Sequence, residues 1–188
     1  MKFLLNDTRV DINKPNKNEL TPFYIAYEKG FIDIVKLLLD DKRMDINKTN
    51  NNGETPFYIA CQNEDFESVK LLLDDERVDV HKADQDGDTP LHIACYNEDI
   101  EIVKLLLNDE RVDINKTNNN GETPFYLACE NGDIEIVKLL LDDERVNINK
   151  ANKYGKTAID IVRERKEGNW KETIELLEPK IGKFFPFL

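Results

Sequence analysis

The sequence predicts an all-α fold with short β-hairpin fingers, in which turn–helix–helix units stack side by side as a solenoid. A Thr-Pro pair recurs at an even 34-residue step from Thr21 onward, and Thr157 falls on the next step with Ala in place of Pro. Two segments that begin at Asp45 and Asp113, DINKTNNNGETPFYIAC and DINKTNNNGETPFYLAC, differ at one position. Self-similarity at a fixed period of about 20–50 residues is typical of proteins built from stacked repeats.

The period divides the chain into one domain over residues 1–180 and an apolar tail at 181–188. Within the domain we expect a partial repeat, four full repeats and a C-terminal capping repeat. Their ranges, in that order, are 1–10, 11–44, 45–78, 79–112, 113–146 and 147–180. Terminal repeats of a solenoid need a polar outer face, and Asp160 and Arg163 supply polar residues in the capping repeat.

Each full repeat begins with a turn and a short helix. Pairs such as Asn52-Gly53 supply the positive φ that a tight turn needs. The Thr that follows is expected as the N-cap and the Pro as the first helical residue, where its missing N–H costs nothing. These helices, FYIAC or LHIAC, are expected to end near Asn63, Asn97 and Asn131.

A second helix is predicted from the pattern DIEIVKLLL, whose apolar residues share one helical face. The residues expected to cap it are Asp65, Asp99 and Asp133. Glu101–Lys104 and Glu135–Lys138 are predicted i,i+3 ion pairs on its other face. The segment DERVDIN is then expected to run extended into the next turn, with Val and Ile facing inward.

The run GDTPLHIACYNEDIEIVKLLL, from Gly87 to Leu107, resembles the ankyrin repeat. The T-P-L-H signature occurs once unaltered, three other units carry T-P-F-Y, and the last carries T-A-I-D. The resemblance covers about Met1 to Glu178 and implies stacked helix–turn–helix units with protruding fingers and a concave binding face. The family's usual step is about 33 residues, so we expect a longer loop after the second helix.

The resemblance also implies a non-enzymatic scaffold for protein–protein interaction, whose partner contacts the finger tips and the exposed side of the first helices. Carried over position by position, the candidate partner-binding residues are Leu20, Asn51, Asn52, Glu54, Gln62, Asp86, Asp88, Tyr96, Asn97, Asn119, Asn120, Glu122, Glu130, Tyr154 and Lys156. Tyr96 and Tyr154 are favoured, because both stand where other units hold polar residues and aromatics dominate interface hot spots. The alternative is that these surface residues vary neutrally and contact no partner.

The charge of the chain bears on its partners. The formal net charge is −12, and the three middle repeats carry −5, −6 and −5. Such a surface argues against nucleic acid, which requires Lys and Arg to displace counterions. It could steer a basic protein partner, or it could serve solubility alone.

The sequence supports no catalytic residue and no cofactor. Ser68 is the one serine and lacks a nucleophile elbow. His81 and His92 occupy different slots of the repeat, and we interpret His92 as structural. There is no Gly-rich loop to hold a phosphate.

Metal binding finds equally little support. Cys61, Cys95 and Cys129 are 34 residues apart in equivalent slots, and packed helices lie about 8–10 Å apart, too far for a disulfide. We expect them to be small buried apolar side chains in a reducing compartment. Residues 84–88 imitate the start of a calcium loop, but the sister fingers carry Asn there, so we interpret them as a turn.

No apolar run approaches the roughly 20 residues of a membrane span, and the apolar start ends after Leu5, too soon for a signal peptide. We therefore expect no membrane contact and a cytoplasmic location, with a nuclear location as the alternative.

Both ends depart from the repeat. Residues 2–10 align with 104–112, so we expect the chain to open inside a second helix without a complete N-terminal cap. Two alternatives follow: an ankyrin segment of a larger protein whose activity lies elsewhere, or self-association through this face or through the tail. The apolar tail residues expected to pack on the last helices or on another molecule are Phe184, Phe185, Phe187 and Leu188.

Overall fold

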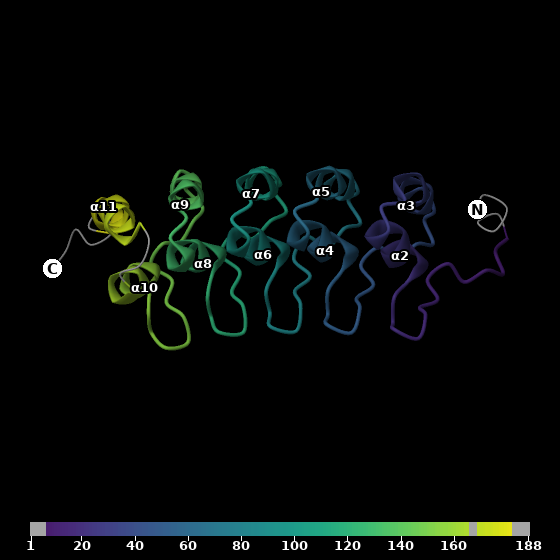
Figure 1. Cartoon of the computed structure of the whole chain (residues 1–188), viewed down its shortest axis with the longest axis horizontal. Helices are drawn as coiled ribbons and strands as arrows, with labels where there is room; N and C mark the ends of the chain where they lie inside the picture. The colour runs from purple at the N-terminus through teal and green to yellow at the C-terminus, as the bar shows by residue number, and fades with distance from the viewer. Residues whose placement is uncertain (1–6, 166–168, 182–188) are drawn as a thin grey trace.

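A computed structural model describes residues 7–165 and 169–181, and ten helices lie within these ranges. Figure 1 shows them in pairs along one axis, with the loops between successive pairs all projecting to the same side. In chain order they are α2 (Pro22–Glu28), α3 (Ile32–Leu39), α4 (Pro56–Gln62), α5 (Phe66–Leu73), α6 (Pro90–Tyr96), α7 (Ile100–Asn108), α8 (Pro124–Asn131), α9 (Ile134–Leu141), α10 (Ala158–Arg165) and α11 (Trp170–Ile181). We number the pairs, from α2–α3 to α10–α11, as the first to fifth units.

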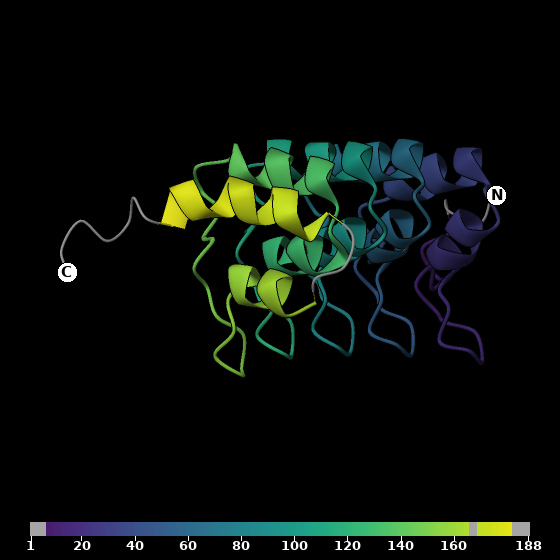
Figure 2. The same cartoon turned by 60° about the vertical axis from the view of Figure 1, so that its left-hand side comes forward.

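The loops that project from the stack, which we call fingers, comprise residues 16–20, 50–54, 84–88, 118–122 and 152–156. Figure 2 shows them as a row of similar loops next to the first helix of each pair. Each is closed by a backbone bond between its ends, as from Asn50 N to Glu54 O at 3.0 Å, around a turn from Gly53 N to Asn50 O at 3.1 Å. No strand occurs in the described ranges. The prediction of β-hairpins is therefore wrong in detail, because a five-residue finger has room for one closing bond but not for a ladder.

The first helix of each unit starts as its Thr-Pro pair predicts. The hydroxyl oxygens of Thr21, Thr55 and Thr123 each accept a hydrogen bond at 3.1 Å from the backbone N–H three residues on. Pro then occupies the first turn. These caps satisfy donors that a helix N-terminus otherwise leaves unpaired.

The second helices form the outer row in Figure 1. The predicted Asp caps are present at α5, α7 and α9, whereas α3 begins after Phe31 and has no side-chain cap. The predicted ion pair Lys104–Glu101 forms at 2.7 Å. The prediction for Lys138 is wrong: its ammonium contacts Glu172 of α11 at 2.8 Å instead of Glu135, because α11 lies beside α9 and presents a carboxylate within reach.

The units share one continuous core. Phe23, Phe57 and Phe125 are fully buried, and Leu91 fills the same slot in the third unit. All three cysteines are buried and unpaired, and burial raises the pKa of each thiol. At the C-terminal end Leu177 is buried and Trp170 packs against the core, as expected of residues that close the stack.

One substitution in this core is compensated across a unit boundary. Tyr27 occupies the slot that Cys61 holds in the next unit, yet it is buried. Ser68 of the second unit stands where Ile102 and Ile136 stand in later units. The Tyr27 hydroxyl lies against Ser68 and Asp65, and burial raises its pKa. The smaller Ser68 therefore makes room for the larger Tyr27.

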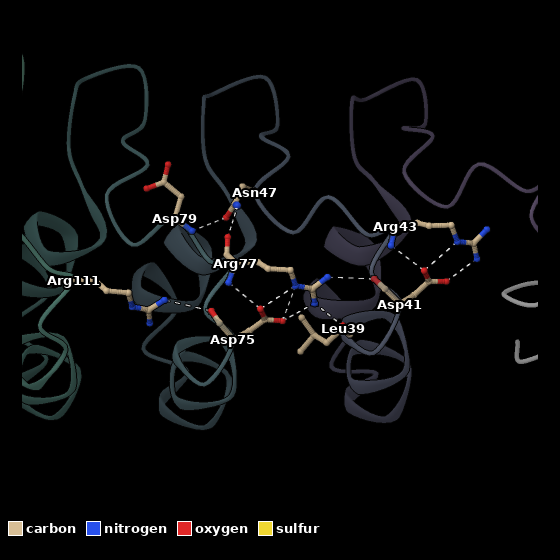
Figure 3. A network of polar contacts seen from close by, with 8 residues as sticks. All are labelled: Leu39, Asp41, Arg43, Asn47, Asp75, Arg77, Asp79 and Arg111. Atoms are coloured by element: carbon tan, nitrogen blue, oxygen red, sulfur yellow. Dashed lines mark hydrogen bonds and ion pairs between the residues drawn. The ribbon is translucent and has the colours of Figure 1, made fainter.

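The sequence suggested that the segment after each second helix runs extended, and this prediction is wrong. The segment forms two successive turns, Asp75 to Val78 and Asp79 to Lys82, which still direct Val78 and Val80 into the core. Within the first turn Arg77 pairs with Asp75 at 2.6 Å and donates to the backbone oxygen of Leu39 in the preceding unit at 2.6 Å (Figure 3). The same contact recurs from Arg111 to Leu73 and from Arg145 to Leu107. These arginines thus satisfy carbonyls at the C-terminal ends of the preceding helices.

An asparagine bridge joins most neighbouring units near the same place. Asn47 donates from Nδ2 to Arg77 O at 2.7 Å and accepts from Asp79 N at 2.8 Å (Figure 3). Asn13 and Asn115 make the equivalent pairs of bonds. His81 takes this slot in the third unit, and its side chain makes no hydrogen bond to the described residues of the fourth.

Candidate partner-binding surface

The fingers owe their shape to an Asn or Asp at the first position and a Gly at the fourth. Asn50 Oδ1 accepts from the backbone N–H of Asn52 at 2.9 Å and of Glu54 at 3.1 Å. Such a side chain mimics a backbone turn. The fourth residue has a positive φ, +80° at Gly87, a conformation that costs glycine least.

Glycine also allows successive fingers to touch. A Cβ on Gly87 would lie 2.7 Å from Asn119 N, and this approach permits a bond from Asn119 N to Asp86 O at 2.9 Å. Equivalent backbone bonds join the second finger to the third and the fourth to the fifth. The first finger carries Glu19 at this position with φ +59°, and no such bond connects it to the second finger in the described structure. The strain of a non-glycine residue there is on the order of 1 kcal/mol.

The fourth position of the T-P-F-Y or T-P-L-H motif reaches forward from each first helix to the next finger. Tyr58 donates its hydroxyl to Asp84 Oδ2 at 2.9 Å. Tyr24 and Tyr126 accept from Asn50 and Asn152, both at 3.2 Å.

His92 takes the same position in the third unit and makes different contacts. Its Nδ1 accepts from Thr89 N at 3.1 Å and lies 2.7 Å from the Thr89 hydroxyl, while Nε2 lies 3.0 Å from Glu122 O. These contacts assign the proton to Nε2. Burial lowers the pKa of His92 to about 4, so the ring is neutral near pH 7. His92 is therefore a structural residue, as its place in the motif suggested.

A hollow of about 390 Å³ opens beside His92, between the third and fourth fingers. It brings together six of the predicted partner-binding residues: Asp86, Asp88, Tyr96, Asn119, Asn120 and Glu122. Burial and neighbouring carboxylates raise the pKa of Asp88, although a hydrogen bond from Asn118 at 2.9 Å opposes the shift.

The predicted residues divide by exposure. The exposed ones are Asn51, Asn52, Asp86, Tyr96, Asn119, Asn120 and Tyr154. The half-buried ones are Leu20, Glu54, Gln62, Asp88, Asn97, Glu122, Glu130 and Lys156. Tyr96 and Tyr154, at 61% and 76%, are the most exposed large hydrophobic side chains among the described residues.

Several half-buried members already have partners within the chain. Glu130 pairs with Arg165 at 3.0 Å and Lys156 with Glu164 at 2.5 Å. Asn97 donates to the backbone oxygen of Gln62 at 2.8 Å. Leu20 packs against the core. Such residues contribute to the stack itself.

Sequence reasoning missed four polar side chains that line the hollow, Tyr58, Asp84, His92 and Asn118, together with the apolar Ile93 and Leu127. A signal was available at Asp84, because the other fingers carry Asn there. The contribution of Tyr58 has no local signal, since it depends on how far one unit reaches into the next.

Within residues 7–165 and 169–181 no group of three or more His, Cys, Asp or Glu residues could hold a metal ion. No helix in the described part of the chain is long and apolar enough to cross a bilayer. The predicted contacts of Phe184, Phe185, Phe187 and Leu188 lie outside the described residues. On the first unit Phe31 is 53% exposed and Ile32 38% exposed.

Stacked helix pairs with Thr-Pro caps, fingers and one continuous core define a repeat solenoid of the ankyrin type. A family model described as "Ankyrin repeats (3 copies)" matches residues 1–84, 42–118, 61–152 and 91–177. The chain belongs to the ankyrin repeat family. Among solved structures it is similar to the crystal structure of EF0377, an ankyrin repeat protein, with 29% identity, a TM-score of 0.82 and coverage of 94% of this chain and 88% of that one. No curated protein matches.

Proposed function

We propose that this protein is a non-enzymatic interaction module that binds a partner protein through the fingers and the adjacent side of the first helices. One observation carries the proposal. Tyr96 and Tyr154 stand in slots that differ among the units and are exposed, whereas Asn118 and Asn152, in a slot that holds Asn in most units, are buried and hydrogen-bonded within the stack. Freely varying positions on an otherwise repetitive surface are those available to specify a partner.

The charge of the middle units favours a basic partner. Their net charges of −5, −6 and −5 contrast with 0 for residues 11–44. Carboxylates on the third finger, Asp86 and Asp88, lie on the same side as Tyr96. A surface of this kind accelerates encounter with a positively charged protein, and the acceleration weakens as salt rises.

The test starts with affinity capture and continues with purified proteins. Proteins retained by the immobilised wild-type chain are identified by mass spectrometry, and each is then purified and titrated by calorimetry against three variants. Tyr96→Gln and Tyr154→Asn place residues that sister units already carry in those slots, and Lys70→Gln alters the outer row of helices as the control.

We expect each tyrosine variant to weaken binding by about fivefold or more, since a hot-spot truncation costs over about 1 kcal/mol. Lys70→Gln should leave the affinity unchanged. Equal affinities for all three variants with every purified partner would contradict a binding surface on the finger side.

Self-association is a second candidate, and the exposed Phe31 and Ile32 of the first unit favour it. Hollows of about 250 and 370 Å³ adjoin Ile32. Phe31→Asp restores the capping residue of the other second helices, so this variant should fold. Light scattering would show a concentration-dependent dimer mass that Phe31→Asp reduces to the monomer; a monomer mass for the wild type at all concentrations would end this candidate.

A further inference from the structure

The hollow beside His92 exists because the third unit differs from its neighbours at one position. Tyr58 and Tyr126 extend a phenol to the next finger, whereas the shorter imidazole of His92 ends at the backbone oxygen of Glu122. Asn118, which would otherwise meet a tyrosine, turns instead toward Asp88 at 2.9 Å. The space so left is about 390 Å³ and opens onto the finger side. We propose that it receives the guanidinium group of one arginine side chain of the partner, an assignment that rests on the proposed function.

The charge around the hollow is the first argument. Asp84, Asp86, Asp88 and Glu122 all line it, and no Lys or Arg of the described residues forms an ion pair with any of them. Toward the C-terminal end the corresponding side of the stack has its own cations, as in the Arg165–Glu130 pair at 3.0 Å. Within the described residues the hollow thus lacks a paired cation such as the one that the fifth unit supplies to Glu130.

Tyr96 is the second and independent argument. It is 61% exposed and lines the hollow, while the same slot holds Glu28, Gln62 and Glu130 in other units. An exposed aromatic face attracts a cation within about 6 Å of the ring. Guanidinium suits this combination better than ammonium, because it is planar, stacks on aromatic rings and donates to carboxylates in pairs.

Depth is the third argument. Asp88 is half-buried, and its carboxylate has one hydrogen-bond donor from a side chain, Asn118. Burial and the neighbouring carboxylates work against its ionised form. A cation entering the hollow relieves this repulsion, so the interaction is stronger there than at the outer tip of a finger.

The test uses capped nine-residue peptides of Gly, Ser and Ala with one central arginine, lysine or citrulline. Each is titrated into the full ¹⁵N-labelled chain and followed by amide chemical shifts. We expect the arginine peptide to bind weakly and to shift the amides of Tyr96, Asn119 and Asn120. The lysine peptide should bind more weakly and the citrulline peptide not measurably, because citrulline keeps the shape of arginine without its charge.

Two variants should each weaken arginine-peptide binding by about two- to fivefold, the range expected of an exposed cation–aromatic contact or ion pair. They are Tyr96→Gln and Asp86→Asn, which reproduce Gln62 and Asn52 of the second unit and so should fold. Tyr154→Asn removes an even more exposed tyrosine outside the hollow and should leave binding unchanged.

Equal binding of the citrulline peptide, equal binding of the lysine peptide, or shifts spread over all acidic units would each overturn the assignment. If binding of a purified partner depends on Tyr154 but not on Tyr96 or Asp86, the arginine assignment fails while the proposed function stands. If a partner binds without using the finger side at all, the proposed function fails, whereas the peptide titration still reports on the hollow.

Discussion

The asparagine bridge between units predicts that one substitution strengthens the stack. Asn47 joins the second unit to the third through Arg77 O at 2.7 Å and Asp79 N at 2.8 Å. His81 stands in the equivalent slot of the third unit, and its side chain forms no such bond to the described residues of the fourth. His81→Asn supplies both bonds at a place where the backbone of the sister units already accommodates them.

The magnitude follows from the two bonds. Each net hydrogen bond contributes about 0.5–1.5 kcal/mol. The slot is only half-buried, so the lower half of that range applies, and ordering the side chain takes back a few tenths. We expect His81→Asn to raise the free energy of unfolding by about 0.5–1.5 kcal/mol, and each 1 kcal/mol raises Tm by roughly 2–4 °C at this chain length. Asn47→His should lower stability by a similar amount.

Guanidinium unfolding followed by circular dichroism measures both variants, with an unchanged m value as the check that the unfolded state is the same. The matched exchange makes the result decisive, since the same two residue types are swapped in the same slot. A loss of stability on His81→Asn, or no loss on Asn47→His, would refute the role assigned to the bridge.

Three further predictions follow from the same structure. Gly87→Ala should lower the free energy of unfolding by at least about 1 kcal/mol more than Gly155→Ala does. Both glycines have a positive φ, but only at Gly87 would a Cβ meet the next finger, at 2.7 Å. Equal losses in guanidinium unfolding would show that finger packing is unimportant. Because burial lowers the pKa of His92 from 6.5 to about 4, the unfolded chain binds the proton more tightly, so stability falls by up to about 3 kcal/mol as the pH drops through this window. In His92→Tyr this pH-dependent loss of stability should be absent from thermal unfolding measured between pH 7 and 4. If the stability of both proteins fell in parallel as the pH dropped, the role assigned to His92 would be contradicted. Tyr27→Cys and Ser68→Ile should each destabilise, whereas the double variant should recover at least about 1 kcal/mol of the summed loss in a double-mutant cycle; strict additivity would mean that the two side chains do not share one space.

Helix starts could be predicted because their signals are local. The hydroxyl of Thr55 and the carboxylate of Asp65 each accept a hydrogen bond from the N–H group three residues on, so the motif itself contains both partners. The exit segment was misjudged although its bonds are also local. Its alternation of Val and Asp suits a strand, but Asp75 closes the first turn by accepting from the backbone N–H groups of Arg77 and Val78.

The candidate surface was predictable as a set of slots but not as a site. Comparison of the repeats singled out Tyr96 and Tyr154, and both are well exposed. It also included Glu130 and Lys156, which pair with Arg165 and Glu164. Arg165 and Glu164 belong to the capping unit, whose sequence departs from the repeat, so no comparison among repeats could assign these two pairs.

The amino-acid sequence by itself determined the number, order and local capping of the units, because each is specified by contacts within a few residues and by a period that repeats them. Only the tertiary structure decided which residues meet across unit boundaries: the choice of Glu172 over Glu135 by Lys138, the room that Ser68 leaves for Tyr27, and the hollow beside His92. The physical reason is that these contacts depend on the spacing and rotation of one unit against the next, and side-chain packing over the whole stack sets both.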